Sequence, residues 1–246
     1  MFNKLKKLLA YLLPRTCILC KHASDRAQDL CSQCLTSLPI LAPGCVYCAT
    51  PLSVEGEAIC GTCLQQPPPY ERLFALFAYQ APITQWIMEL KFHERLIHAQ
   101  ILGELMATAL QTWYLDKPLP ECIIPIPLHN KRLHERGFNQ ALELARPIAK
   151  TLGLALNFTS CQRVKSTQAQ ARLIRKQRTQ NMKNAFKIQG LEKIRSVAVV
   201  DDVTTTGQTL QAFCQALKQA GVAQIDVWCC AKTLIKEHEA SKGVKS

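Results

Sequence analysis

The chain has 246 residues, 48% of them hydrophobic, which is enough for one α/β domain and a small appendage. The apolar run Leu8–Leu13 is too short to cross a membrane, and cysteine-rich sequence follows it in place of a small-residue cleavage site. These features exclude a membrane span and a cleaved signal in residues 1–13, so we expect a cytoplasmic protein. Residues 1–13 are basic and then apolar, which predicts a short amphipathic helix, with a weak membrane-surface anchor as the alternative.

The formal net charge is +12, and nearly all of the excess lies in one segment. Residues 129–187 contain thirteen Lys or Arg side chains against two acids, Glu135 and Glu143. One small anion does not require so many cations, so the segment favours a polyanionic partner such as nucleic acid. A solvated basic helix face is the alternative.

Eight cysteines form four pairs, each with two residues between the thiols. This spacing lets both thiolates reach one tetrahedral metal ion, with each sulfur at about 2.3 Å, and two pairs complete a structural site. Eight ligands allow two zinc ions. Consecutive pairs are the simplest assignment, and crossed pairing stays open because the spacers are shorter than in the usual four-cysteine pattern. The predicted ligands are Cys17, Cys20, Cys31, Cys34, Cys45, Cys48, Cys60 and Cys63.

Disulfides and a redox dithiol are the alternatives to zinc. Four regular pairs argue against a single redox site, and nothing in the sequence signals export. The remaining cysteines stand alone in apolar or mixed surroundings, where a thiol usually behaves as a small buried hydrophobe. We assign no chemistry to Cys122, Cys161, Cys214, Cys229 and Cys230.

After the cysteines, Gln65–Pro69 predicts a stiff extended connector, and a second domain begins near Tyr70. Apolar runs predict strands over residues 73–79, 122–126, 197–200 and 225–231. Helical spacing predicts helices over residues 83–92, 97–114, 141–152 and 208–220, the last two ended by Gly153 and Gly221. Alternating strands and helices predict a parallel sheet flanked by helices, with ligand at the carboxyl ends of the strands.

Residues 197–209 carry the most informative motif. Four apolar residues predict a buried strand, two acids stand at its carboxyl end, and a hydroxyl-rich turn with one glycine leads into a helix. Free N–H groups at a helix start and threonine hydroxyls bind phosphate, and the acids can accept hydrogen bonds from ribose hydroxyls beside a magnesium ion. The predicted sugar-phosphate site comprises Asp201, Asp202, Thr204, Thr205, Thr206, Gly207, Gln208 and Thr209.

This loop resembles the phosphoribosyl diphosphate (PRPP) loop of type I phosphoribosyltransferases, which has two acids, a spacer of two residues and then Thr-Thr-Gly-x-Thr. The resemblance implies PRPP with Mg²⁺ as the ligand. The alternative is a buried strand that ends in two solvated acids capping a helix. A Walker A loop is excluded, because no Gly-Lys-Ser/Thr sequence follows.

Cations follow the predicted strand at residues 122–126, at the strand end where the pyrophosphate half of PRPP is expected. Arg132 and Arg136 offer forked donors to phosphate oxygens, so we predict that they bind pyrophosphate. His129 either donates to pyrophosphate or fills the loop.

Taken together, the motifs resemble those of the ComF family, also called the GntX or amidophosphoribosyltransferase-like family. The resemblance covers the cysteine pairs, the proline linker, Leu90-Lys91-Phe92, a Pro-x-Pro-Leu-His segment with Arg-Gly-Phe-Asn-Gln, and the acidic loop. We accordingly expect a short basic helix and double zinc ribbon in residues 1–66 and a linker in 67–72. A type I phosphoribosyltransferase-like α/β domain is expected in 73–236, and a polar tail in 237–246.

The family also has a Thr-x-x-Gln-x-x-Leu stretch followed by Arg-x-x-Asn. In related phosphoribosyltransferases the equivalent segment is a mobile flap over the site. Here Gln177 stands where an acid is common, which leaves charge pairing inside the flap open. The flap residues implied by the resemblance are Gln170, Arg172, Arg178 and Asn181.

The family role implied is natural transformation, in which single-stranded DNA is handled as it enters the cytoplasm. The implied partners are PRPP, single-stranded DNA, and helicase or other DNA-uptake proteins. The alternative is an active phosphoribosyltransferase of nucleotide metabolism that acts on an unidentified base or amine. No amidotransferase nucleophile is evident, because the residue after the first methionine is Phe2 and not cysteine.

Overall fold

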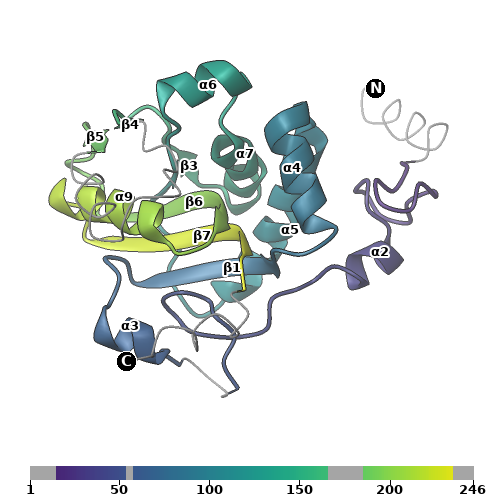
Figure 1. Ribbon diagram of the computed structural model, residues 1–246, viewed down its shortest axis with the longest axis horizontal. Coiled ribbons are helices and arrows are strands. Elements are labelled where there is room, and N and C mark those ends of the chain that lie inside the picture. The colour runs from purple at the N-terminus through teal and green to yellow at the C-terminus, as the bar shows by residue number, and fades with distance from the viewer. Residues whose placement is uncertain (1–14, 54–57, 166–184, 235–246) are drawn as a thin grey trace, which may run out of the picture. The chain divides into compact units, whose positions relative to one another are not determined.

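The computed structural model describes residues 15–53, 58–165 and 185–234 (Figure 1). The chain divides into two compact units, residues 1–39 and residues 40–246. The described part of the first unit contains the short helix α2 (Ser32–Thr36) and an antiparallel bridge between Thr16 and Ala23. Apart from cysteines, its buried apolar side chains are Leu30 and Leu38. Two side chains do not make a hydrophobic core, so the described part of this unit needs another source of stability.

The second unit is built on a parallel sheet of five strands in the order β1-β7-β6-β2-β3. Every pair of neighbouring strands runs in parallel, and β6 and β7 are buried over most of their length. Burial on both faces is the usual state of a parallel sheet, and it confirms the predicted α/β class. The strands are β1 (Arg72–Ala78), β2 (Cys122–Pro125), β3 (Ala155–Leu156), β6 (Ser196–Thr204) and β7 (Gln224–Lys232).

Helices cover the two faces of this sheet (Figure 1). On one face, Val197 and Val199 of β6 share a core cluster with Phe213 of α9 (Gln208–Gln219). On the other, α5 (Leu96–Trp113) and α7 (Gln140–Leu152) pack together and contact β7 and β6. The two helices approach so closely that a Cβ at Gly103 would overlap the Pro147 ring and the Leu144 carbonyl. No helix in the described ranges is both long and apolar enough to cross a membrane.

The remaining elements lie around the sheet. Helix α4 (Ile83–His93) precedes α5, and helix α6 (Asn130–Arg136) follows β2. A two-stranded antiparallel ribbon is formed by β4 (Cys161–Arg163) and β5 (Phe186–Ile188), and α3 (Gly61–Gln65) precedes β1.

The predicted strands and helices match the structure closely, although α6 was not predicted and β6 is longer than expected. The predicted strand at residues 197–200 continues as β6 to Thr204, because Thr204 pairs with Lys232 of β7. Asp201 and Asp202 therefore lie within the strand and not after its end. Neighbouring residues of a strand point to opposite faces, so the two carboxylates approach the end of the sheet from different sides.

The last four of the eight paired cysteines, Cys45, Cys48, Cys60 and Cys63, are part of the unit that contains the sheet. Residues before and among them run along the free edge of β1, where the Leu41 N–H donates to the Leu76 carbonyl at 2.9 Å and the Leu73 N–H donates to the Val46 carbonyl at 2.8 Å. Ala49 belongs to the same core cluster as Val197, Val199 and Phe213. This backbone pairing satisfies the edge strand, which would otherwise present unpaired N–H and C=O groups.

Candidate functional site

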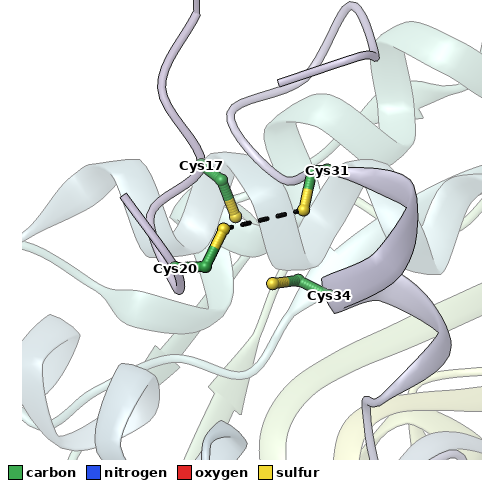
Figure 2. Close-up of side chains that lie close together, drawn as sticks. All are labelled: Cys17, Cys20, Cys31 and Cys34. Carbon is green, nitrogen blue, oxygen red and sulfur yellow. Dashed lines mark hydrogen bonds between the residues drawn. The ribbon is translucent and has the colours of Figure 1, made fainter. Parts of the chain in front are cut away.

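The first cysteine tetrad converges on one point in the first unit. The Sγ atoms of Cys17, Cys20, Cys31 and Cys34 all lie within 4.8 Å of one another (Figure 2), and those of Cys20 and Cys31 are 3.8 Å apart. A tetrahedral zinc ion with sulfur at about 2.3 Å holds its ligands about 3.8 Å from one another. The donor set and its spacing therefore fit one structural zinc ion.

Backbone N–H groups adjust the acidity of these thiols. Burial alone would raise the pKa of Cys17, but N–H groups of Cys20, Cys31 and Leu19 outweigh it and lower that pKa to about 6. Burial and the neighbouring thiols raise the pKa of Cys34 to about 12. A divalent cation would stabilise all four thiolates at once, because its charge offsets their mutual repulsion.

The second tetrad has the same form within the second unit. The Sγ atoms of Cys45, Cys48, Cys60 and Cys63 also lie within 4.8 Å of one another. Those of Cys48 and Cys60 are 3.8 Å apart, and the Cys60 N–H donates to Cys45 Sγ at 3.3 Å. In both tetrads the structure brings consecutive cysteine pairs together, which is the grouping that the simplest assignment expects.

A cavity of about 380 Å³ lies at the carboxyl end of β6. It brings together every residue of the predicted sugar-phosphate site and both predicted pyrophosphate ligands, Arg132 and Arg136. Binding of PRPP by these residues stays a prediction. Sequence reasoning assigned no role to the other residues that line the cavity, namely Lys91, Phe92, Ile126, Leu128, Gln140, Arg163, Val203 and Leu210.

The loop between β6 and α9 has the form of an anion site. Gly207 stands at the helix start with φ of +71°, a left-handed conformation that favours glycine, and it has no side chain to cap the helix. The first helical bond runs from the Gln211 N–H to the Gly207 carbonyl at 2.8 Å, so the amides of residues 208–210 have no partner within the helix. On the other side, Lys232 Nζ donates to the Thr205 carbonyl at 2.9 Å and fixes the loop.

Two carboxylates stand beside this loop. Asp202 is only 4% exposed, and its carboxylate forms an ion pair with Lys91 at the end of α4. The Asp202 N–H donates to Asp201 Oδ1 at 2.9 Å. Burial, and then the charge of Asp202, raise the pKa of Asp201 well above its ordinary value. Hydroxyl donors or a cation brought by a ligand would relieve this accumulation of negative charge.

Positive charge gathers in the same cavity. Burial lowers the pKa of Arg136 and of Arg163, and the charge of Arg132 lowers both further. Among the described residues, Lys91, Arg132, Arg136 and Arg163 are the cations that line the cavity, and the Arg136 guanidinium donates to Gln140 Oε1. Cations held close enough to depress one another's pKa are stabilised by an anion between them.

His129 and Asn139, which follow β2 in the chain, have structural roles. His129 caps helix α6, since its Nδ1 accepts from the Lys131 N–H at 3.2 Å, and it does not line the cavity. Asn139 caps α7 by accepting from the Ala141 N–H at 3.0 Å, and its Nδ2 donates to the Ile126 carbonyl at 2.9 Å. Asn139 therefore holds the segment after β2 against the start of α7.

The predicted flap residues Gln170, Arg172, Arg178 and Asn181 lie outside the described residues. The chain on either side of them is described, and there β4 pairs with β5. Arg163, the last residue of β4, lines the cavity.

Comparisons with known proteins agree with this architecture. A family model described as the double zinc ribbon domain matches residues 8–64, and one described as the phosphoribosyl transferase domain matches residues 139–246. The chain is thus a phosphoribosyltransferase-fold protein with an amino-terminal double zinc ribbon. DNA utilization protein YhgH of Salmonella typhi is 34% identical over 232 residues, which cover 90% of this chain and 99% of that protein. Competence protein F of Haemophilus influenzae is 34% identical over 224 residues, covering 88% of this chain and 96% of that protein.

This chain therefore belongs to the ComF family, which includes these two relatives. Among solved structures, a purine phosphoribosyltransferase from Pyrococcus horikoshii is 20% identical with a TM-score of 0.31, covering 56% of this chain and 77% of that one. The sheet topology and the two family models define the fold, and this structural likeness adds nothing to them.

Proposed function

We propose that the cavity binds PRPP with Mg²⁺, and that the protein acts on or with single-stranded DNA during DNA uptake in natural transformation. The observation that carries the proposal is the convergence of three kinds of group in one cavity: two carboxylates, a helix start with free amides, and several cationic side chains. PRPP presents the matching groups, which are ribose hydroxyls, a 5-phosphate and a pyrophosphate. A cavity of about 380 Å³ is within the range of small-molecule sites.

Each part of PRPP has a complementary part of the cavity. The amides and hydroxyls of residues 205–209 suit the 5-phosphate, and Asp201 and Asp202 suit the ribose hydroxyls. Arg132 and Arg136 suit the pyrophosphate, because guanidinium groups donate in pairs to phosphate oxygens. A Mg²⁺ ion held by the sugar and pyrophosphate would be tolerated beside the two carboxylates, and it would neutralise charge on the pyrophosphate.

Thermal denaturation with and without PRPP and Mg²⁺ tests this binding, since a ligand that binds only the folded state raises the Tm. The proposal predicts a rise that saturates with PRPP and requires Mg²⁺. An unchanged Tm at every PRPP concentration would contradict it.

The DNA part of the proposal is supported by the basic segment and by the relatives. DNA utilization protein YhgH and competence protein F carry these roles in their names, and residues 129–187 hold thirteen basic side chains. We propose a cytoplasmic protein, because thiols of metal-binding cysteines stay reduced there. Helicase or other uptake proteins are its proposed partners.

Single-strand binding should show a steep dependence on salt, because cations on the protein release counterions from the DNA. Replacement of Arg172, Arg175, Lys176 and Arg178 with alanine should reduce both the affinity and the salt slope. Binding that does not respond to salt would count against this part of the proposal.

A second candidate function is phosphoribosyl transfer, favoured by the position of Arg132 and Arg136 in the cavity. The bond from ribose C1 to pyrophosphate would break while a bond to an acceptor nitrogen forms, and the acceptor would lose a proton. The two guanidinium groups would stabilise the departing pyrophosphate. Release of pyrophosphate above background with a nucleobase or amine would support transfer, and none with any acceptor would count heavily against it.

A further inference from the structure

Phe92, the penultimate residue of α4, lines the cavity and yet is 63% exposed. Large aromatic side chains usually bury most of their surface, so an exposed ring inside a polar cavity calls for a reason. Met88 and Leu96 are also exposed nearby, at 48% and 47%, but neither lines the cavity. Phe92 thus differs from the scattered exposed apolar residues that are normal on a protein surface.

One side of the Phe92 ring is already occupied. The Arg136 Cζ atom lies 5.9 Å from the ring centre, within the range of a cation–π contact. Arg136 is itself held by its hydrogen bond to Gln140, and Asn139 fixes the start of the helix that carries Gln140. The ring is therefore supported from one side, while most of its surface stays open to a flat partner.

The rest of the cavity indicates what that partner carries. The β6–α9 loop offers amides and hydroxyls for a phosphate, and the two aspartates offer acceptors for sugar hydroxyls. A ligand that joins a sugar phosphate to a flat aromatic group is a nucleotide. Stacking of a base on an aromatic side chain is a sequence-tolerant interaction, because every base has a π face.

We infer that Phe92, backed by Arg136, is a stacking platform for a nucleobase whose ribose 5-phosphate occupies the phosphate loop. This rests on the proposed function for the loop and adds the class of ligand. A base joined to a sugar 5-phosphate is found both in a free nucleoside monophosphate and in the 5′-terminal nucleotide of a single DNA strand. Only the free ribonucleotide also offers sugar hydroxyls to the two aspartates, and the experiment separates these sources.

Calorimetric titration of the zinc-loaded full chain with ribose 5-phosphate, AMP and 5′-phosphorylated oligothymidylate tests the inference. AMP should bind about 5- to 150-fold more tightly than ribose 5-phosphate, the gain expected from one stacked base. Phe92→Ala should remove this preference and leave the affinity for ribose 5-phosphate within about twofold, because the substitution does not touch the loop. Phe92→Trp should retain the preference, and Met88→Ala should change neither affinity.

The outcomes separate the two proposals. If ribose 5-phosphate binds but AMP binds no better, or if Phe92→Ala keeps the preference, the stacking platform is overturned and the phosphate loop stands. If neither ribose 5-phosphate nor AMP binds, the proposed function fails and the platform falls with it. Where the preference depends on Phe92, tighter binding of the oligonucleotide identifies a DNA end as the ligand, and tighter binding of AMP identifies a free nucleotide.

Discussion

Lys91, near the carboxyl end of α4, forms an ion pair with Asp202 in the last third of β6. The Asp202 side chain is 6% exposed and that of Lys91 is 21% exposed, so the pair is mostly shielded from water. Lys91 lies outside residues 139–246, which match the phosphoribosyl transferase family model. The contact therefore ties an earlier helix to the edge of the phosphate loop and fixes the orientation of one proposed ribose ligand.

Lys91→Met should destabilise the protein, because it leaves the buried Asp202 carboxylate without its cation. The loss of one partner of a buried pair costs on the order of 3 kcal/mol. The double variant Lys91→Met/Asp202→Asn should recover part of that loss, since it removes the stranded charge. Urea unfolding of the two variants measures both effects, and a single variant as stable as the wild type would contradict this account of the pair.

Asp201→Asn should stabilise the protein at neutral pH. Burial and Asp202 raise the pKa of Asp201 in the folded state, so stability present below the ordinary value of 3.8 is lost as the pH rises toward the folded pKa. Asparagine does not ionise and escapes that loss. We expect the Tm at pH 7.5 to rise by about 2–4 °C, the effect of about 1 kcal/mol in a domain of this size, and the gain to vanish near pH 4.

Asp202→Asn is the matched control, because it should lower the Tm at pH 7.5 by leaving Lys91 unpaired. A gain for Asp201→Asn that persists unchanged at pH 4 would show that ionisation is not its cause.

Loss of one cysteine tetrad should lower the Tm of the sheet-containing unit, and loss of the other should not. Cys45→Ser/Cys48→Ser disrupts the tetrad whose chain pairs with the edge of β1, so it should lower the Tm of the sheet-containing unit by about 5 °C or more. Cys17→Ser/Cys20→Ser disrupts the tetrad of the other unit and should leave that Tm unchanged within about 1 °C. Each variant should lose one zinc ion per chain in elemental analysis. Equal Tm losses in both variants would contradict the division of roles.

Arg132→Ala and Arg136→Ala should weaken PRPP binding about tenfold or more each, the usual effect of losing a charged hydrogen bond. Neither substitution should weaken the binding of ribose 5-phosphate by more than about threefold, because that ligand has no pyrophosphate to face the arginines. Competition titrations measure the affinity for each ligand. An equal loss of affinity for PRPP and for ribose 5-phosphate would show that these arginines do not bind the pyrophosphate.

The parts of the site that are contiguous in sequence could be predicted, and the parts that meet only on folding could not. The β6–α9 loop could be predicted because its strand, acids, glycine and helix start lie within thirteen residues. The four cysteine pairs were visible in the same way, but their spacing left open which pairs share a metal ion. Lys91 and Arg163 reach the cavity from α4 and β4. Leu90-Lys91-Phe92 contributed to the family resemblance, but nothing in the local sequence placed Lys91 or Arg163 at the cavity.

Two differences have specific physical causes. Helix α6 was not predicted because it buries no residue, and a helix without a buried face has no hydrophobic period to detect. The extension of β6 through Asp201 and Asp202 was missed because aspartate is disfavoured in strands. Pairing with β7 overrides that preference and places both acids at the cavity.

Binding of PRPP by the acidic loop can be measured by calorimetric titration of the zinc-loaded protein with PRPP and Mg²⁺. We predict saturable binding to the wild type that is lost in Asp201→Ala/Asp202→Ala. Met88→Ala, on an exposed position outside the cavity, should bind like the wild type. Absence of binding to the wild type, or equal binding to the double alanine variant, would contradict the claim.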